Sequence, residues 1–149
     1  TRLTAELVTA DAFDWMAPDP FDAILLDAPC SATGTIRRHP DLPHRFEPAT
    51  LPMLTDLQAR LLGQAWRWLR PGGRLVYATC SLLRAEGEAR IDAFLADRPD
   101  GARDPLNPED PALPPGAVDG AGALRTLPSM LDGIGGLDGF YACRLRKLA

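Results

Sequence analysis

Residues 21–34 read FDAILLDAPCSATG, a short apolar run that passes directly into a polar, glycine-containing segment. Turn-forming prolines lie on both sides of the apolar part, which is typical of a buried strand in a parallel sheet. Residues 69–81 read LRPGGRLVYATCS and repeat the arrangement, with an apolar run followed by a cysteine and a serine. The sequence therefore predicts two buried strands, each leading into a cysteine-containing loop.

A helix is predicted between these two strands. Apolar residues recur at helical spacing from 51 to 69, and Pro71, Gly72 and Gly73 follow, as expected just beyond a helix end. A strand, a helix and a second strand form a βαβ unit, in which the strands are parallel and the crossover is right-handed. The apolar positions of this helix are Leu54, Leu57, Leu61, Leu62, Ala65, Trp68 and Leu69.

The rest of the chain continues the alternation of strands and helices. Residues 5–9 are predicted to form a short strand that ends before Asp11, and a second helical pattern is centred on residues 91–95. Residues 140–145 have the character of a terminal strand. The segment 99–122 is rich in proline, glycine and aspartate and shows no periodicity, which predicts a long, flexible surface loop. The whole pattern is that of an α/β fold.

Length and composition fit one soluble domain. The chain has 149 residues, 46% hydrophobic and 24% charged, which excludes a disordered or fibrous protein. No apolar run could span a bilayer and no targeting sequence is present, so we expect a cytoplasmic protein without a membrane partner. Three cysteines, none in Cys-x-x-Cys spacing, argue against a disulfide framework or a zinc ribbon. Because the net charge is −4, any contact with nucleic acid has to be local.

Acidic and nucleophilic residues follow the predicted strands. Ligands bind beyond the carboxyl ends of strands in an open parallel sheet, and these positions hold Asp11, Asp27, Cys30 and Cys80. If the two cysteine-bearing strands are neighbours, about 4.8 Å apart, both thiols can face one pocket. Buried cysteines often serve only as small apolar residues, an interpretation that suits Cys143, which lies inside a strand. The polar surroundings of the other two cysteines favour a chemical role.

Two segments resemble a known family. Residues 27–34 (DAPCSATG) and the following RRHPD at 37–41 resemble motif IV of the RNA cytosine-C5 methyltransferases of the NOL1/NOP2/Sun family. Residues 69–81 resemble motif VI of that family, and the RRHPD continuation is most similar to the RsmB branch, the bacterial 16S ribosomal RNA methyltransferases. Further positions that fit the family pattern are Gln58, Glu86, Glu88 and Asp138-Gly139-Phe140-Tyr141.

The resemblance implies a Rossmann-like class I methyltransferase fold and a specific reaction. The enzyme would transfer a methyl group from S-adenosylmethionine, without a metal, to carbon 5 of a cytidine in RNA, with 16S rRNA as the expected partner. By family analogy, Cys80 is the nucleophile that adds to carbon 6 and thereby pushes electron density onto carbon 5. Asp27 hydrogen-bonds the pyrimidine and borders the cofactor, and Cys30 assists the elimination that releases the product.

Other residues are assigned by the same resemblance. Asp11 matches the motif III acid that contacts the adenosine part of S-adenosylmethionine, with helix capping as its alternative role. Pro29 is assigned to the cofactor site and stiffens the backbone that presents the first cysteine. Arg37, Arg38 and His39 are expected to contact RNA, since arginine pairs with phosphate and stacks on bases. The two histidines lack the spacing and the fourth ligand of a zinc site.

Part of the family pattern is absent from the sequence. Neither a glycine-rich strand-to-helix turn nor the acid expected to hold the cofactor ribose precedes Asp11. The resemblance therefore implies that residues 1–149 are the C-terminal portion of a methyltransferase domain, truncated on its N-terminal side, with Thr1 inside a helix of a longer enzyme. On this interpretation the fragment alone is inactive, its partner is the missing N-terminal part, and the sheet edge near residues 5–9 drives self-association.

Two other classes of function stay open. The chain could be a non-catalytic fragment that serves only as an interaction or assembly module. It could also be an unrelated cysteine hydrolase or redox protein, for which a histidine near Cys80 or a Cys-x-x-Cys motif would be expected. Neither feature is visible in the sequence.

Overall fold

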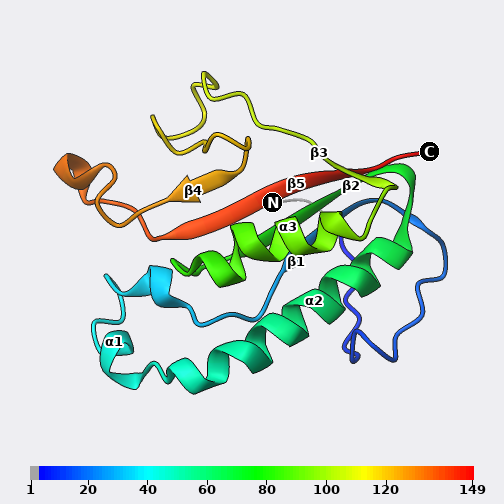
Figure 1. Cartoon of the computed structure of the whole chain (residues 1–149), viewed down its shortest axis with the longest axis horizontal. Helices are drawn as coiled ribbons and strands as arrows, with labels where there is room; N and C mark the ends of the chain where they lie inside the picture. Colours follow the sequence, from blue (N-terminus) through cyan, green and yellow to red (C-terminus); the bar gives the residue numbers. More distant parts are fainter. Residues whose placement is uncertain (1–3) are drawn as a thin grey trace.

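A five-stranded mixed sheet forms the centre of the structure, a computed structural model that describes residues 4–149 (Figure 1). The strands are β1 (Phe21–Asp27), β2 (Leu69–Thr79), β3 (Gly101–Arg103), β4 (Leu124–Thr126) and β5 (Phe140–Lys147). Their order is β1-β2-β5-β3, and β4 pairs with the other end of β5. β1 runs parallel to β2, whereas β2, β3 and β4 pair with β5 in antiparallel register.

Helix α2 (Leu51–Trp68) connects β1 to β2 and confirms the predicted βαβ unit with its parallel strands. It ends one residue earlier than predicted, because the backbone of Leu69 is already extended and begins β2. The Pro-Gly-Gly segment therefore lies within β2, where the pairing with β1 is irregular. Gly72 has a φ of +79° at this point, a left-handed conformation that glycine adopts without strain.

Helix α3 (Glu88–Ala96) is the second predicted helix, and it lies beside α2 (Figure 1). Both helices contribute to one core on the same face of the sheet. The Trp66 ring of α2 meets the Phe94 ring of α3 edge-on, with 5.3 Å between centroids, and its indole N–H donates to Asp100 at 2.9 Å. The other large, fully buried apolar side chains of this core are Leu62, Leu69, Leu75, Tyr77, Ile91, Tyr141 and Leu145.

The sequence pattern does not reveal several short elements. Helix α1 (Leu42–Arg45) and strand β4 are each too short to show a periodicity. In the described part of the chain, no helix combines the length and the apolar character that crossing a membrane requires. The single 3-10 turns are η1 (Thr33–Thr35), η2 (Pro48–Thr50), η3 (Arg84–Glu86) and η4 (Asp132–Ile134).

The segment 99–122 contains a short strand, a backbone hydrogen bond and a buried residue, which a mobile surface loop would lack. The prediction of irregular structure is wrong for Gly101–Arg103, which forms β3 by pairing with the end of β5. The backbone N–H of Leu106 donates to the carbonyl oxygen of Gly122 at 2.9 Å, and Ala117 is fully buried. The pairing with β5 is a tertiary effect that a local pattern of prolines and glycines does not contain. Flexibility in the rest of the segment stays a prediction.

The prediction of a strand over residues 5–9 is wrong. The segment has no regular structure, and the side chains of Leu7 and Val8 are exposed. A strand needs a neighbour for its backbone N–H and C=O groups, and no strand of the described sheet pairs with this segment. The helix expected around Thr1 falls outside the described residues.

One end strand of the described sheet is β1, and not the segment 5–9 whose edge was predicted to drive self-association. Within residues 4–149 its outer side has no strand partner, and its Leu25 side chain is 71% exposed. Unpaired backbone groups beside apolar side chains form a template for association with another chain. We therefore expect the 149-residue chain to self-associate through β1. Light scattering should report a mass that rises above the monomer with concentration.

A pair of variants tests this expectation. Leu25→Glu places a charge on the exposed face of the edge strand β1 without opening the core, so it should return the chain toward the monomer. Met53→Glu is the matched control, because Met53 is equally exposed, at 68%, but lies on α2. A monomeric mass for the unmodified chain at every concentration would contradict the expectation.

Candidate active site

Cys30 and Cys80 lie side by side at the carboxyl ends of β1 and β2. Asp27 pairs in register with Ala78, so the loops that follow the two strands leave the sheet at the same edge. The two sulfur atoms are 3.5 Å apart, within reach of a thiol–thiol hydrogen bond. The structure thus confirms that the two cysteine loops bring their thiols together.

The surroundings of Cys30 favour its protonated form. Burial raises the pKa of the Cys30 thiol to about 12, against a hydrogen bond from the Ala32 backbone that lowers it. Negative charge on Cys80 and on Glu86 raises the pKa further. At neutral pH Cys30 is therefore a thiol that holds its proton next to the sulfur of Cys80.

The raised pKa of Cys30 predicts the pH dependence of its alkylation. Iodoacetamide reacts with the thiolate, so the rate at Cys30 in the folded protein should keep rising from pH 9.0, the ordinary pKa, toward about 12. In urea the rate should level off near pH 9.0. The unfolded chain releases the Cys30 proton at a lower pH than the folded protein does. The raised pKa therefore also lowers the free energy of unfolding as the pH rises from 9.0 toward about 12. Mass spectrometry of the Cys30 peptide measures both rates, and identical profiles would contradict the assignment.

A network of hydroxyl groups and one carboxylate joins the two cysteine loops. The hydroxyl of Ser31 lies 3.1 Å from that of Ser81 and 3.3 Å from that of Thr33. Both serines also donate to the carboxylate of Glu86, which is fully buried. The sequence pattern matches Glu86 to the family but does not disclose these contacts. The available signal is the repeated Cys-Ser pair after each strand.

Gly34 joins both loops to the segment that precedes β5. Its backbone N–H donates to the carbonyl oxygen of Cys80 at 2.9 Å, and its own carbonyl accepts from the Gly139 N–H at 2.7 Å. A Cβ atom at position 34 would overlap the Gly139 carbonyl and lie 2.9 Å from the Cys80 carbonyl oxygen. Three backbone segments therefore meet where only glycine leaves room.

Two of the predicted cofactor residues lie in the first cysteine loop. Asp27 is the last residue of β1, and Pro29 directly precedes Cys30. Both Asp27 and Pro29 are exposed. The carbonyl oxygen of Pro29 accepts a hydrogen bond from Nε2 of Gln58 at 2.9 Å. Helix α2 thereby holds the backbone that carries the cysteine.

Asp11 lies on an exposed turn instead of at the end of a strand. Its carboxylate accepts a hydrogen bond from the Phe13 N–H at 2.8 Å, and its carbonyl oxygen accepts from the Trp15 N–H at 2.9 Å. Aspartate often bonds the backbone two residues further on and so initiates a turn. The predicted position after a strand is therefore wrong, because residues 5–9 have no strand to pair with.

The predicted RNA-contacting residues follow η1 on the surface. Arg38 forms an ion pair with Asp138 at 2.6 Å, and Arg37 donates to the carbonyl oxygen of Gly135. His39 is exposed. An exposed ion pair contributes only about 0–1 kcal/mol, so Arg38 can exchange Asp138 for a phosphate at little cost.

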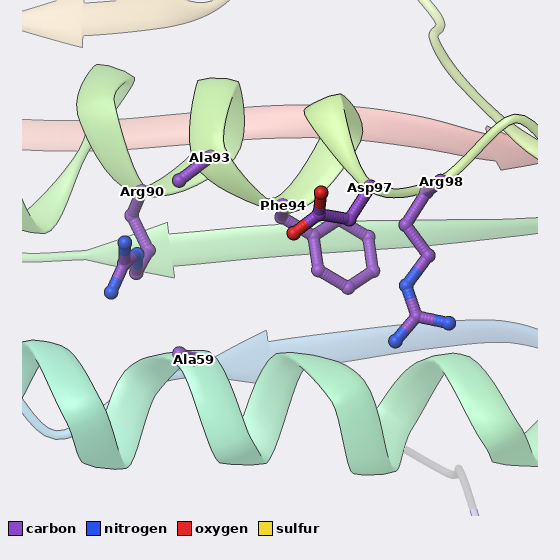
Figure 2. A pocket seen from close by; sticks show the side chains of 6 residues that line it. All are labelled: Ala59, Arg90, Ala93, Phe94, Asp97 and Arg98. Atoms are coloured by element: carbon purple, nitrogen blue, oxygen red, sulfur yellow. The ribbon is translucent and has the colours of Figure 1, made fainter.

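A separate pocket lies between α2 and α3 (Figure 2). Arg90 and Arg98 extend from the α3 side toward α2. Arg90 donates to the carbonyl oxygen of Thr55 at 2.8 Å, and the Arg98 guanidinium lies 5.0 Å from the centre of the Phe94 ring. Both arginines therefore serve the packing of the helices. No predicted site residue lines this pocket, which is formed by Ala59, Arg90, Ala93, Phe94, Asp97 and Arg98.

Sequence comparison identifies relatives of the chain. The family described as 16S rRNA methyltransferase RsmB/F matches residues 2–146. Ribosomal RNA small subunit methyltransferase B of Xylella fastidiosa is 50% identical over 150 residues, which cover 98% of this chain and 32% of that protein. The protein of the same name from Shewanella oneidensis is 41% identical over 148 residues, covering 97% of this chain and 32% of that protein. The chain thus spans about a third of the length of these relatives.

Solved structures share the mixed α/β sheet. NSun6 from Pyrococcus horikoshii matches with a TM-score of 0.72 and 26% identity, covering 97% of this chain and 35% of that chain. A methyltransferase homolog protein from the same organism matches with a TM-score of 0.64 and 33% identity, covering 87% of this chain and 40% of that chain. The sheet described above is therefore that of part of a methyltransferase structure. Since the family match covers almost every residue, this chain belongs to the RsmB/F family of 16S rRNA methyltransferases.

Proposed function

We propose that this chain forms the reactive part of an enzyme that methylates carbon 5 of a cytidine in 16S rRNA, using S-adenosylmethionine. The observation that carries the proposal is the pair of thiols 3.5 Å apart at the carboxyl ends of two neighbouring parallel strands. Such a position is where an open parallel sheet binds its ligands. An rRNA substrate also implies a cytoplasmic enzyme.

Cys80 is the proposed nucleophile. Carbon 5 of cytosine is too weak a nucleophile to accept a methyl group directly. Addition of the Cys80 thiolate to carbon 6 forms a sulfur–carbon bond and moves the electrons of the 5,6 double bond toward carbon 5. Asp27, exposed at the end of β1, hydrogen-bonds the pyrimidine edge and stabilises the adduct.

Cys30 is proposed to act after methyl transfer. At that stage carbon 5 loses its proton, the 5,6 double bond forms again and the Cys80 sulfur leaves. The Cys30 sulfur lies 3.5 Å from the Cys80 sulfur, which places it beside an adduct on Cys80. We propose that Cys30 gives its own proton to solvent and, as a thiolate, accepts the proton from carbon 5.

Exposed acidic groups suit the proposed cofactor. S-adenosylmethionine supplies a methyl group bound to a positively charged sulfur and presents hydroxyl and amino groups as donors. The carboxylates of Asp11 and Asp27 can accept from such donors, and the backbone at Pro29 borders the same loop. These residues fit the donor groups of the cofactor, and we propose that they hold it.

The RNA is proposed to approach over the turn that follows η1. Arg37, Arg38 and His39 offer charged and aromatic groups on this surface, which suit phosphates and bases. A cytidine inside a duplex cannot reach a thiol, so the target base must be single-stranded or flipped out of its stack.

We further propose that residues 1–149 are the C-terminal portion of a Rossmann-like class I methyltransferase domain. The uncovered edge of β1 is then the place where the first strands of that domain would pair. Leu25 stands on the face of β1 opposite Ile24 and Leu26, which pack against the core, and the preceding part of the domain would cover this face as well.

The proposal is tested by methyl transfer in a full-length protein that contains this chain. Incubation with labelled S-adenosylmethionine and unmodified 16S rRNA should yield labelled 5-methylcytidine on nucleoside analysis. Labelled product at another atom or in another class of substrate would overturn it. Binding to rRNA without any transfer would instead favour the assembly-module interpretation.

The 149-residue chain by itself should bind S-adenosylmethionine weakly or not at all. Its candidate contacts, Asp11, Asp27 and Pro29, are all exposed to solvent, where hydrogen bonds to a ligand contribute little because water competes for them. Calorimetric titration measures the affinity. A dissociation constant near micromolar, about −8 kcal/mol, would show that these residues suffice.

A further inference from the structure

A buried carboxylate links the two cysteine loops. We propose that Glu86, in η3, is a positioning residue that sets the relative placement of the two thiols. The inference rests on the proposed methyl transfer and adds a residue that touches neither the cytidine nor the cofactor in that scheme.

The contacts of Glu86 reach both loops at once. Oε1 accepts from the backbone N–H of Ser31 at 2.9 Å and from Nε2 of Gln58 at 3.0 Å. Oε2 accepts from the hydroxyl of Ser31 at 2.5 Å and from the hydroxyl of Ser81 at 2.6 Å. Each serine directly follows one of the paired cysteines. One carboxylate therefore holds the residues next to both sulfur atoms.

The burial of Glu86 restrains the two cysteine loops to one relative position. The Glu86 side chain is fully buried, and an isolated buried carboxylate is strongly unfavourable unless hydrogen bonds compensate its lost hydration. Here four donors do so, and any displacement of one loop breaks some of these bonds. Because the penalty for an unsatisfied buried acceptor is large, the loops are restrained to one relative position.

Glu86 is itself fixed to the sheet. Its backbone carbonyl oxygen accepts hydrogen bonds from the hydroxyls of Tyr77 at 2.9 Å and Thr79 at 3.4 Å, both on β2. Gln58 adds a second connection, since its Nε2 also donates to the carbonyl oxygen of Pro29. Glu86 and Gln58 therefore connect the first cysteine loop to β2 and α2 through hydrogen bonds.

Glu86→Gln tests the proposal in a full-length protein that contains this chain. Glutamine has nearly the same shape but only one acceptor oxygen, and its NH₂ group would face existing donors. We expect kcat to fall roughly 100-fold, the cost typical of a misplacement of about 1 Å, while KM for RNA changes little. Asp92→Asn is the matched control, because Asp92 is a surface carboxylate of α3, and it should retain wild-type activity.

A second readout does not depend on methyl transfer. Phenylarsine oxide bridges two thiols only when they lie close together, so it should bind Cys30 and Cys80 rapidly in the wild type. Bridging should slow in Glu86→Gln, as measured by mass spectrometry below the unfolding temperature. If Glu86→Gln does not fold, Ser81→Ala removes one of the four donors and should show the same two effects more weakly.

The outcomes separate this inference from the proposed function. Wild-type protein that methylates no RNA would overturn the proposed function, yet slower arsenical bridging in Glu86→Gln would still support the positioning role. An active wild type with wild-type kcat and bridging in the folded variants would overturn the positioning role alone. A lower melting temperature with both readouts unchanged would give Glu86 a merely structural role.

Discussion

We expect Cys80→Ala to abolish both methyl transfer and covalent attachment to RNA in a full-length protein that contains this chain. The variant lacks the sulfur proposed to form the bond to carbon 6, and without that bond carbon 5 does not become nucleophilic. Loss of a covalent nucleophile removes the reaction path itself, so the activity should fall to background. A denaturing gel with labelled RNA and a methylation assay measure the two effects.

Cys30→Ala should give the opposite result on the same gel. Addition through Cys80 and methyl transfer should still occur, but elimination should slow, so that protein linked to methylated RNA accumulates. Cys143→Ala is the matched control, because Cys143 is buried in β5 and belongs to neither cysteine loop. It should cost some stability through the cavity it leaves and trap no RNA. An adduct with Cys80→Ala and none with Cys30→Ala would reverse the two roles.

Gly34→Ala should be the most destabilising single methyl group that can be added near the site. The new Cβ would overlap the Gly139 carbonyl and crowd that of Cys80, so three backbone segments would have to separate. We expect a loss of about 3 kcal/mol, at the upper end for overpacking. Urea denaturation measures it, and the spacing of the two thiols should change as well.

Gly63→Ala is the control for Gly34→Ala. Gly63 lies in the middle of α2, and a Cβ there would meet only the Arg98 guanidinium at 3.9 Å. Alanine is the better helix former, so this variant should gain roughly 0.5–1 kcal/mol. Equal effects of the two substitutions would show that the packing around Gly34 is not as described.

The elements that the sequence predicts well are those whose signal is local. The apolar positions of α2 repeat over five turns, and the runs in β1 and β2 are bounded by prolines and glycines. The elements that were predicted wrongly are those whose formation depends on pairing with a distant part of the chain. Residues 5–9 have strand-like composition but no neighbour to pair with, whereas Gly101–Arg103 has loop-like composition and pairs with β5.

The candidate site also has a part that the sequence predicts and a part that only the fold reveals. Cys30 and Cys80 were predictable, because both follow strands of one βαβ unit and parallel neighbours end at the same edge. The contacts of Glu86 were not, because they join η3 to a loop 55 residues earlier in the chain. A buried acid and two serine hydroxyls become recognisable as a network only when the fold brings them together.

The most direct test of the proposed mechanism is mass spectrometry of the protein–RNA adduct formed with 5-fluorocytidine. Fluorine at carbon 5 cannot leave as a proton does, so a full-length protein that contains this chain should stay bonded to the RNA after methyl transfer. We predict that the nucleotide is found on the peptide that contains Cys80, with one added methyl group. An adduct on Cys30, or methylation of normal RNA with no adduct on either cysteine, would contradict the mechanism.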